Sequence, residues 1–185
     1  MATMYIFFAM LMILLAANQA EARPPATSPK QEKYLKRVGA KFLAEQAKRE
    51  GVVTLKSGML VEVLKSATDE TAKSPTKFDS CDVTYSGTLK DGTKFDSGTT
   101  SFSPSQVIKG WTEAMQLMAE GDKWKLYIPY DLAYGPSGSP PKIGPYAPLV
   151  FEIEIHKVKS SGGKTLLDAR KAFDEAKATA PASEL

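Results

Sequence analysis

The sequence predicts an α+β fold: an antiparallel sheet with one short helix lying on it, and a further helix before and after the sheet segments. Short segments with alternating apolar residues follow one another through the middle of the chain, and turn residues separate them. One short helical pattern begins at Gly110, between two of these segments. Two longer helical patterns, over residues 30–50 and 165–178, flank the group.

The first 22 residues are predicted to be a signal peptide. Residues 4–17 are almost wholly apolar, which is about the length of a signal-peptide core and too short for a comfortable membrane span. Ala20 and Ala22 are small residues at the two positions that a signal peptidase reads, so the mature chain should begin at Arg23. No Lys or Arg precedes the apolar run, which leaves an uncleaved anchor as the alternative. We therefore expect an extracellular protein, or one in the lumen of the secretory pathway, without a stable membrane span after processing.

The composition is that of a globular protein, with 43% hydrophobic residues, 24% charged residues and a net charge of +3. Because no dense block of Lys and Arg occurs, nucleic acid is not an expected partner. Cys81 is the only cysteine and His156 the only histidine, and they lie far apart. One residue of each kind excludes an intrachain disulfide and argues against a Ser–His–Asp, Cys–His or zinc site. We interpret Cys81 as a buried thiol and expect no metal and no cofactor.

The segment of residues 23–51 is predicted to be a linker followed by one amphipathic helix. Ser28 and Pro29 are typical of a helix start, apolar residues then recur at helical spacing, and Gly51 ends the pattern. With about 21 residues, from 30 to 50, this helix is short for a strong two-stranded dimer. A monomer is therefore expected.

Residues 52–160 are predicted to form the sheet domain. Asp91 and Gly92 mark a hairpin, and residues 98–105 are interpreted as a loop of small residues. Residues 135–148 contain eight Gly or Pro, which excludes a helix or a central strand, and a loop this long in a compact domain is usually functional or disordered. Strands are predicted over residues 52–55, 60–65, 78–89, 94–97, 122–129 and 149–158.

Residues 161–185 are predicted to be a glycine joint, a helix and a tail. Gly162 and Gly163 interrupt the preceding strand pattern. Thr165 and Asp168 resemble a capping box, and apolar residues at helical spacing extend the helix to about residue 178.

Trp111 is the most unusual residue of the short middle helix, because it directly follows Gly110 at the expected helix start. Gly110 lets the backbone turn where a Cβ would clash. Helix side chains lean toward the N-terminus, so Trp111 should project at the open end of its helix. Two interpretations stay open: a plug of the core, or the floor of an apolar pocket. Aromatic residues at strand ends and in loops, together with the carboxylate of Asp96, indicate a pocket, and an aromatic-rich core with unrelated loops is the alternative.

Five motifs in order across residues 76–159 closely resemble the FKBP-type peptidyl-prolyl cis-trans isomerases. Each motif is weak alone, and the order of all five is specific. The segment of residues 52–59 behind a helix resembles the macrophage infectivity potentiator branch, which is secreted or surface-exposed and implies a role in virulence or protein folding. The motifs are Val83-Thr84-Tyr85-Ser86-Gly87-Thr88-Leu89 with Asp91-Gly92, Phe95-Asp96-Ser97, Val107-Ile108-Lys109-Gly110-Trp111, Ala133-Tyr134-Gly135 and Leu149-Val150-Phe151-Glu152.

The resemblance implies a twisted sheet wrapped on the short helix and an isomerase that rotates X-Pro bonds of peptides or partner proteins without a cofactor. It implies Trp111 as the floor under the proline ring, and the Ile108 backbone N–H and the Tyr134 hydroxyl as donors to the peptide. Macrolide inhibitors of the rapamycin type are implied ligands. A module that binds proline, or acts as a chaperone, with little turnover is the alternative. The implied catalytic residues are Asp96, Tyr134, Trp111 and Ile108, and the implied substrate-binding residues are Tyr85, Phe95, Phe102, Gln106, Val107, Ile143 and Phe151.

Three departures from the family pattern concern substrate preference rather than the pocket. No arginine follows Asp96 in the next four residues, where many members have one. Lys142 and Gly144 stand where Ile and Pro are common, and Tyr146 stands where a smaller polar residue or His is common.

Overall fold

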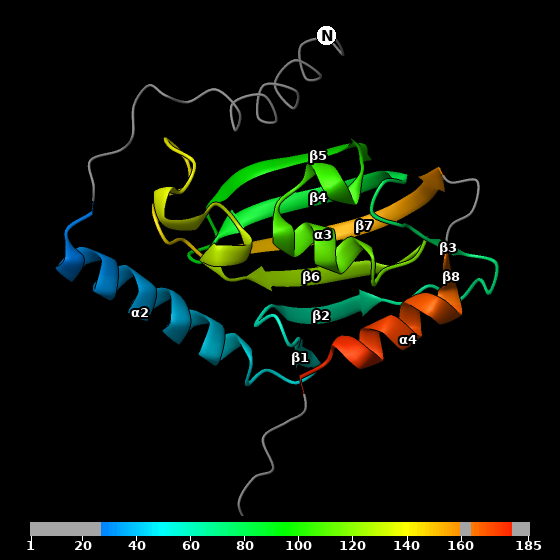
Figure 1. Cartoon of the computed structure of the whole chain (residues 1–185), viewed down its shortest axis with the longest axis horizontal. Helices are drawn as coiled ribbons and strands as arrows, with labels where there is room; N and C mark the ends of the chain where they lie inside the picture. Colours follow the sequence, from blue (N-terminus) through cyan, green and yellow to red (C-terminus); the bar gives the residue numbers. More distant parts are fainter. Residues whose placement is uncertain (1–26, 160–163, 179–185) are drawn as a thin grey trace, which may run out of the picture.

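The computed structural model describes residues 27–159 and 164–178. The predicted signal peptide of residues 1–22, the glycine joint at 162–163 and the tail after residue 181 lie outside these ranges. The centre of the molecule is a six-stranded antiparallel sheet with the strand order β1-β2-β6-β7-β4-β5 (Figure 1). Its strands are β1 Val52–Thr54, β2 Leu60–Lys65, β4 Ser80–Leu89, β5 Lys94–Phe102, β6 Lys123–Ile128 and β7 Leu149–Lys159.

In the described ranges three α-helices accompany the sheet, and the short one lies against its face (Figure 1). The predicted fold class is therefore confirmed. A separate two-stranded sheet joins β3 and β8 beside α4. The helices are α2 Pro29–Gln46, α3 Lys109–Met115 and α4 Leu166–Ala176, and the small strands are β3 Lys73–Ser74 and β8 Lys164–Thr165.

The loop predicted over residues 98–105 was wrong in its first half, because β5 continues to Phe102. Tyr85 pairs with Gly98 and Cys81 with Phe102, so β4 holds this segment along its whole length. Strand β5 lies at the end of the strand order and most of its residues face solvent. Its small polar residues therefore show no apolar alternation from which the strand could have been predicted. The N-terminal helix is also shorter than predicted and ends at Gln46.

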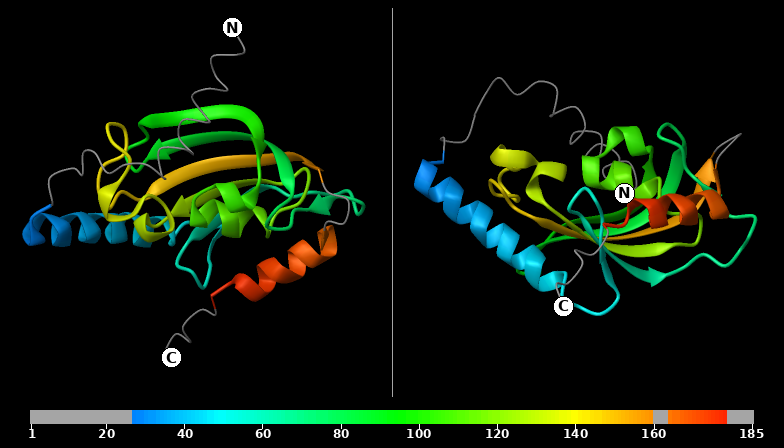
Figure 2. Two further views of the ribbon diagram at one scale, coloured as in Figure 1. Left: turned by 45° about the horizontal axis from the view of Figure 1, so that its top comes forward. Right: turned by 60° about the horizontal axis from the view of Figure 1, so that its bottom comes forward.

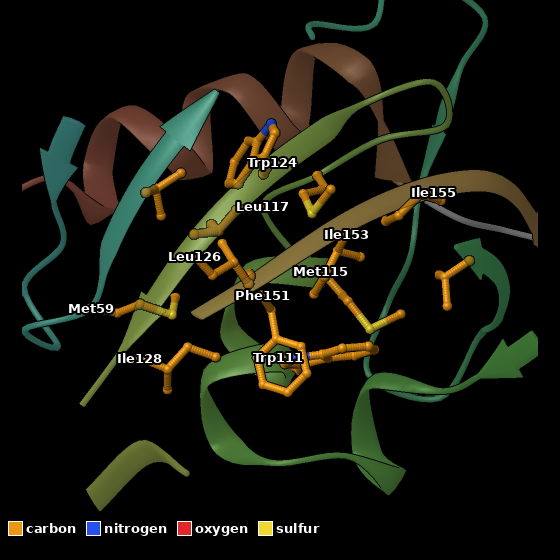
Figure 3. Packing of buried hydrophobic residues seen from close by; sticks show 14 of the residues in the cluster. Met59, Trp111, Met115, Leu117, Trp124, Leu126, Ile128, Phe151, Ile153 and Ile155 are labelled. Atoms are coloured by element: carbon orange, nitrogen blue, oxygen red, sulfur yellow. The ribbon is translucent and has the colours of Figure 1, made fainter. Parts of the chain in front are cut away.

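The main hydrophobic core lies between the sheet and helix α3 (Figure 3). Alternate residues of β7, from Leu149 to Ile155, point into it, as the alternation in the sequence predicted. Helix α3 sits very close to the sheet at Gly110, where an added Cβ would lie 2.6 Å from Cγ2 of Ile128. The predicted need for a glycine before Trp111 is thus confirmed as a close approach of α3 to β6.

Helix α4 closes the same core from another side. Thr165 and Asp168 form the predicted capping box, in which each residue's side chain accepts a hydrogen bond from the other's backbone N–H. Phe173 packs on Trp124 with ring centroids 4.7 Å apart. Arg170 binds both carboxylate oxygens of Asp122, at 2.7 and 2.9 Å.

Helix α2 packs elsewhere, on a small cluster of Leu60, Tyr127 and Val150. Ser28 caps it as predicted, because its hydroxyl accepts the Gln31 N–H at 3.3 Å. Phe42 and Leu43 supply the contacts of the helix to this cluster.

Candidate functional site

Trp111 and four other aromatic rings, which come from strands β4, β5 and β7, form one group. The Trp111 ring centroid lies 5.3 Å from that of Tyr85, 5.9 Å from Phe102 and 5.1 Å from Phe151. All three pairs are nearly perpendicular, with interplanar angles of 78°, 83° and 85°. Phe95 extends the group through an edge contact to Phe151 at 5.4 Å. Edge-to-face packing is a favoured aromatic geometry, so these rings form one stable cluster, which we call the Trp111 cluster.

Trp111 is a residue of the main core, which is the first of the two interpretations that the sequence left open. Its side chain is 4% exposed and belongs to the main core, beside Met115 and Phe151 (Figure 3). Its indole N–H is buried and finds no hydrogen-bond acceptor among the described residues, which is uncommon in a folded protein. The Trp124 indole, outside the cluster, shares this condition, so the unpartnered donor alone does not identify a site.

Asp96 lies at the edge of the Trp111 cluster and is held by two donors. The Tyr85 hydroxyl donates to Oδ2 at 2.9 Å, and the Ser97 N–H donates to Oδ1 at 2.9 Å. Burial, and then the charge of Asp96, raise the pKa of Tyr85. Tyr85 is therefore a neutral donor at ordinary pH, and its hydroxyl holds one oxygen of Asp96.

Tyr134 stands near the same carboxylate. Desolvation and then the charge of Asp96 raise its pKa, so its hydroxyl keeps its proton near neutral pH. Tyr134 is 36% exposed, whereas Trp111 is only 4% exposed. The hydroxyl can thus act as a hydrogen-bond donor at the rim of the cluster.

The segment before helix α3 carries the remaining polar groups. Ile108 is extended, with φ −59° and ψ 153°, and its carbonyl accepts the Thr112 N–H at 3.0 Å. Its own N–H makes no hydrogen bond to any residue of the described ranges. Val107 is partly buried against the core, whereas Gln106 is exposed and its side-chain oxygen accepts the Ser103 N–H at 3.3 Å. Gln106 therefore fixes the turn before Ile108.

The long loop, which we define as residues 130–148, brings Tyr134 and Ile143 to the cluster. Ile143 is 2% exposed and belongs to the main core. It pairs with Ser139 through two backbone hydrogen bonds of 2.9 and 3.0 Å. The Lys142 ammonium donates to the Phe95 carbonyl at 2.9 Å and attaches the loop to β5. The sequence identified Lys142 only as a departure from the family pattern, because a contact across 47 positions leaves no periodic signal.

Gly87 is a residue of the site that sequence reasoning did not single out. A Cβ added there would lie 2.6 Å from Phe151 and 2.8 Å from Phe95, so a glycine lets both rings pack over β4. A glycine inside a strand pattern is the signal that would have identified this close approach.

The lone cysteine and histidine lie outside the Trp111 cluster. Cys81 is fully buried, as predicted, and burial raises the pKa of its thiol to about 12. His156 shares a hydrogen bond of 2.7 Å with the Thr84 hydroxyl. Within residues 27–159 and 164–178, no three His, Cys, Asp or Glu side chains gather in a group that could hold a metal ion. That part of the chain also contains no helix both long and apolar enough to cross a membrane.

Comparison with known proteins places this arrangement in a family. The pattern of the FKBP-type peptidyl-prolyl cis-trans isomerases matches residues 71–156, which include Tyr85, Asp96, Trp111 and Tyr134. The chain belongs to this family. The domain amino-terminal to FKBP-type isomerases matches residues 9–63, which include helix α2.

Relatives of this isomerase family cover most of the chain. The macrophage infectivity potentiator of Trypanosoma cruzi is 46% identical over 138 residues, which are 71% of this chain and 69% of that protein. The outer membrane protein MIP of Legionella longbeachae is 39% identical over 80% of this chain and 62% of that protein. Among solved structures, a peptidyl-prolyl isomerase from Pseudomonas syringae has a TM-score of 0.66 at 36% identity, covering 72% of this chain and 98% of the other. FkpA from Escherichia coli has a TM-score of 0.65 at 31% identity, covering 87% and 72%.

Membership of the FKBP-type isomerases confirms three predictions from the sequence. The resemblance, the fold class and the class of enzyme all agree with the family and its solved structures. Five of the eleven predicted site residues form the Trp111 cluster, Asp96 bonds Tyr85 at its edge, and the charge of Asp96 acts on Tyr134. Val107, Ile108 and Ile143 belong to the main core or pack against it, and the Gln106 side chain serves a turn.

Proposed function

We propose that the Trp111 cluster is the site at which the chain accelerates rotation about X-Pro bonds. The observation that carries this proposal is the meeting of five aromatic rings next to Asp96 and the Tyr134 hydroxyl. The Trp111 cluster combines apolar rings with a few polar groups at its rim, which is the usual composition of a small-molecule site.

The chemistry requires no nucleophile. An X-Pro bond rotates over a barrier of about 20 kcal/mol because its C–N bond is partly double. Twisting removes the resonance, so the twisted state has a less polarised carbonyl than the planar one. Water stabilises the planar, polarised state, and an apolar surface withdraws that stabilisation. A site that excludes water and fits the twisted form therefore lowers the barrier.

Ten of the eleven predicted residues have a role in this scheme, and Gln106 is the exception. Trp111 lies under the proline ring, and the Ile108 N–H and the Tyr134 hydroxyl bond the carbonyl oxygens of the peptide. Asp96, oriented by Tyr85, acts as a local charge beside the twisting amide and not as a general base. The side walls come from Phe95, Phe102, Val107, Ile143 and Phe151.

Access to Trp111 requires movement at the rim of the cluster. Because the indole is 4% exposed, a proline ring reaches it only if partly exposed neighbours move aside. Tyr85 and Phe102 of the cluster are partly exposed, and Tyr134 at its rim is 36% exposed. Because a hydrogen bond to Asp96 holds Tyr85, we expect substrate to displace Phe102 and Tyr134 before it contacts Trp111.

Export and ligand binding are further parts of the proposal. The relatives named macrophage infectivity potentiator and outer membrane protein MIP support a location outside the cytoplasm and a role in infection or protein folding. Sequencing the N-terminus of protein recovered from the medium should give a chain that begins at or near Arg23. An intact Met1 there would contradict cleavage. Rapamycin-type macrolides should occupy the same floor and bond the Ile108 amide.

A protease-coupled assay on an X-Pro peptide tests the site. Trp111→Leu and Asp96→Val should each lower kcat/KM about ten- to a hundredfold, since a factor of ten corresponds to about 1.4 kcal/mol of barrier. Tyr134→Phe should be mildest, because it removes one hydrogen bond worth about 0.5–1.5 kcal/mol. Tyr34→Phe, at an exposed tyrosine of α2, is the matched control and should leave kcat/KM unchanged.

Rapamycin binding separates the possible outcomes of this assay. Loss of both activity and macrolide affinity in folded Trp111→Leu would support the proposal. Full macrolide affinity in that variant would place the site elsewhere. A wild-type chain that binds the macrolide but shows no turnover would instead be a proline-binding module.

A further inference from the structure

Helix α2 touches the long loop through a lysine and two tyrosines. The Lys36 ammonium lies 5.1 Å from the ring centroid of Tyr146 and 6.0 Å from that of Tyr130. The two rings meet edge to face at 5.2 Å, with an interplanar angle of 70°. Lys36 also pairs with Glu32 one helical turn earlier, at 2.6 Å. A cation over aromatic faces is an attractive contact, so this group ties α2 to both ends of the loop.

The helix backbone follows the loop at a second point. Gly39 is the only buried residue of α2, and a Cβ there would lie 3.4 Å from Cδ of Pro148 and 3.7 Å from the Tyr146 carbonyl oxygen. Glycine is unfavourable inside a helix, and here it leaves room for little more than a methyl group. Figure 2 shows α2 running beside the yellow segment that contains the loop.

Tyr146 connects this contact to the candidate site. Its side chain is 7% exposed, and its backbone has φ +56°, a left-handed conformation that non-glycine residues rarely adopt. Its N–H donates to the Gly135 carbonyl at 3.2 Å, and Gly135 directly follows Tyr134. Ile143 lies three residues before Tyr146 and is held in the core. A shift of Tyr146 would therefore move both site residues of the loop.

We propose that Lys36 and Tyr146 form a positioning contact through which helix α2 holds Tyr134 and Ile143 in the geometry that X-Pro rotation needs. This inference rests on the function proposed above. Neither Lys36 nor Tyr146 touches the substrate in this scheme. On the other side the loop is held by Lys142, which donates to the Phe95 carbonyl, so loss of the α2 contact should loosen the loop without releasing it.

The test uses the full chain and the variant Lys36→Met, which keeps the length of the side chain and removes its charge. We expect kcat/KM to fall about two- to fivefold, the range for an exposed cation over an aromatic ring, with an unchanged Tm. The Ile143 and Tyr146 amides should exchange hydrogen faster by a similar factor. Lys36→Arg should restore both values, because a guanidinium also binds aromatic faces.

A matched control comes from the same helix. Lys41 pairs with Glu45 one turn later, at 3.9 Å, as Lys36 pairs with Glu32, and it lies away from the loop tyrosines. Lys41→Met should leave kcat/KM and the exchange of both loop amides unchanged. An equal loss of activity in Lys41→Met would show a general effect of helix charge and would overturn the inference.

The remaining outcomes separate this inference from the function on which it rests. An active wild type with an unaffected Lys36→Met variant would overturn the inference alone. Faster amide exchange with unchanged kcat/KM would show that the contact has only a structural role, and this result would also overturn the inference. An inactive wild-type chain would overturn the proposed function, and the inference with it.

Discussion

Helices α2 and α4 come from opposite ends of the chain and are attached to the sheet in different ways (Figure 1). Helix α4 buries Ala169 and Phe173, and Phe173 belongs to the main core, where it packs on Trp124. Helix α2 buries only Gly39 and packs through the partly buried Phe42 and Leu43 on the small cluster. Helix α2 thus lies outside the main core, and helix α4 completes it.

The polar contacts of the two helices also differ in burial, since that of α4 is buried and that of α2 is partly exposed. Asp122 is fully buried and accepts hydrogen bonds from the Ala67 and Ala119 N–H groups at 2.7 Å each. It also accepts hydrogen bonds from Nη1 and Nη2 of Arg170. The corresponding contact near the end of α2 joins Arg49 to Tyr127 and Glu62, and the Arg49 side chain is 47% exposed. Losing α4 would leave a buried charge without its partner, whereas losing α2 would expose groups that water can solvate. We infer that α4 belongs to the folding unit and that α2 is an addition acting on the loop.

The largest expected effect comes from cutting the chain between the sheet and α4. A fragment of residues 51–160 lacks Arg170 and Phe173, so Asp122 stays unpaired and Trp124 uncovered. We expect it to keep the fold and measurable isomerase activity with a much lower unfolding free energy than a fragment of residues 51–178. Urea unfolding of both fragments measures the difference. Equal midpoints would contradict the assignment of α4 to the folding unit.

Arg170→Met tests the buried ion pair by itself. Removing one partner of a buried pair costs about 3–5 kcal/mol, because the other charge is left without compensation. Thermal and urea unfolding should therefore show a loss of this size. Lys171→Met, at the exposed neighbour, is the control and should change the unfolding free energy by less than about 0.5 kcal/mol. A small effect at Arg170 would mean that water reaches Asp122.

A matched pair of phenylalanines compares the packing of the two helices. Phe173→Ala removes a ring that is 8% exposed and should cost about 3–5 kcal/mol. Phe42→Ala removes a partly buried ring from α2 and should cost only about 1–2 kcal/mol. Urea unfolding measures both values in the full chain. The reverse order would make α2 the main stabilising helix.

Alkaline pH should weaken the packing of α2 on Tyr127 and leave the contact between Arg170 of α4 and Asp122 unchanged. Burial, and then the Glu62 carboxylate, raise the pKa of Tyr127 from 10.0 to about 12. Because the folded pKa is the higher one, the stabilisation is complete below about pH 10 and is lost as pH rises toward 12. Tyr127→Phe should therefore lose less stability than wild type between pH 9 and pH 12, as followed by urea unfolding. Identical pH profiles would contradict the raised pKa.

Local patterns were sufficient to predict most of the fold. The alternation in β7, the hairpin at Asp91-Gly92 and the caps at Ser28 and Thr165 all depend on neighbours within a few positions, and all were found. The second half of β5 was missed, because an edge strand facing solvent needs no apolar alternation. Its strand character depends on pairing with β4, which the local composition does not reveal.

The candidate site was predicted from the resemblance and not from periodicity. The rings around Trp111 lie up to 66 positions apart in the sequence, from Tyr85 to Phe151, and only the family pattern connected them. The contacts that hold the loop were not predicted, because Lys142 with Phe95 and Lys36 with Tyr146 are single polar contacts across large separations. Such contacts follow from the packed chain and leave no pattern in composition or spacing.

The polar edge of the sheet has a consequence for solubility. Strand β5 ends the strand order, so its outer edge has no partner strand within the described residues. An exposed apolar edge invites pairing with another chain, which is a common route to aggregation. Five of the nine residues of β5 are Ser, Thr or Gly, and Lys94 and Asp96 add charges. At the opposite end the chain after α4 pairs with β1, through the Ala178 N–H and the Thr54 carbonyl at 2.8 Å. The β1 edge thus pairs with the segment after α4 and the β5 edge is hydrophilic, which disfavours pairing of β5 with a second chain.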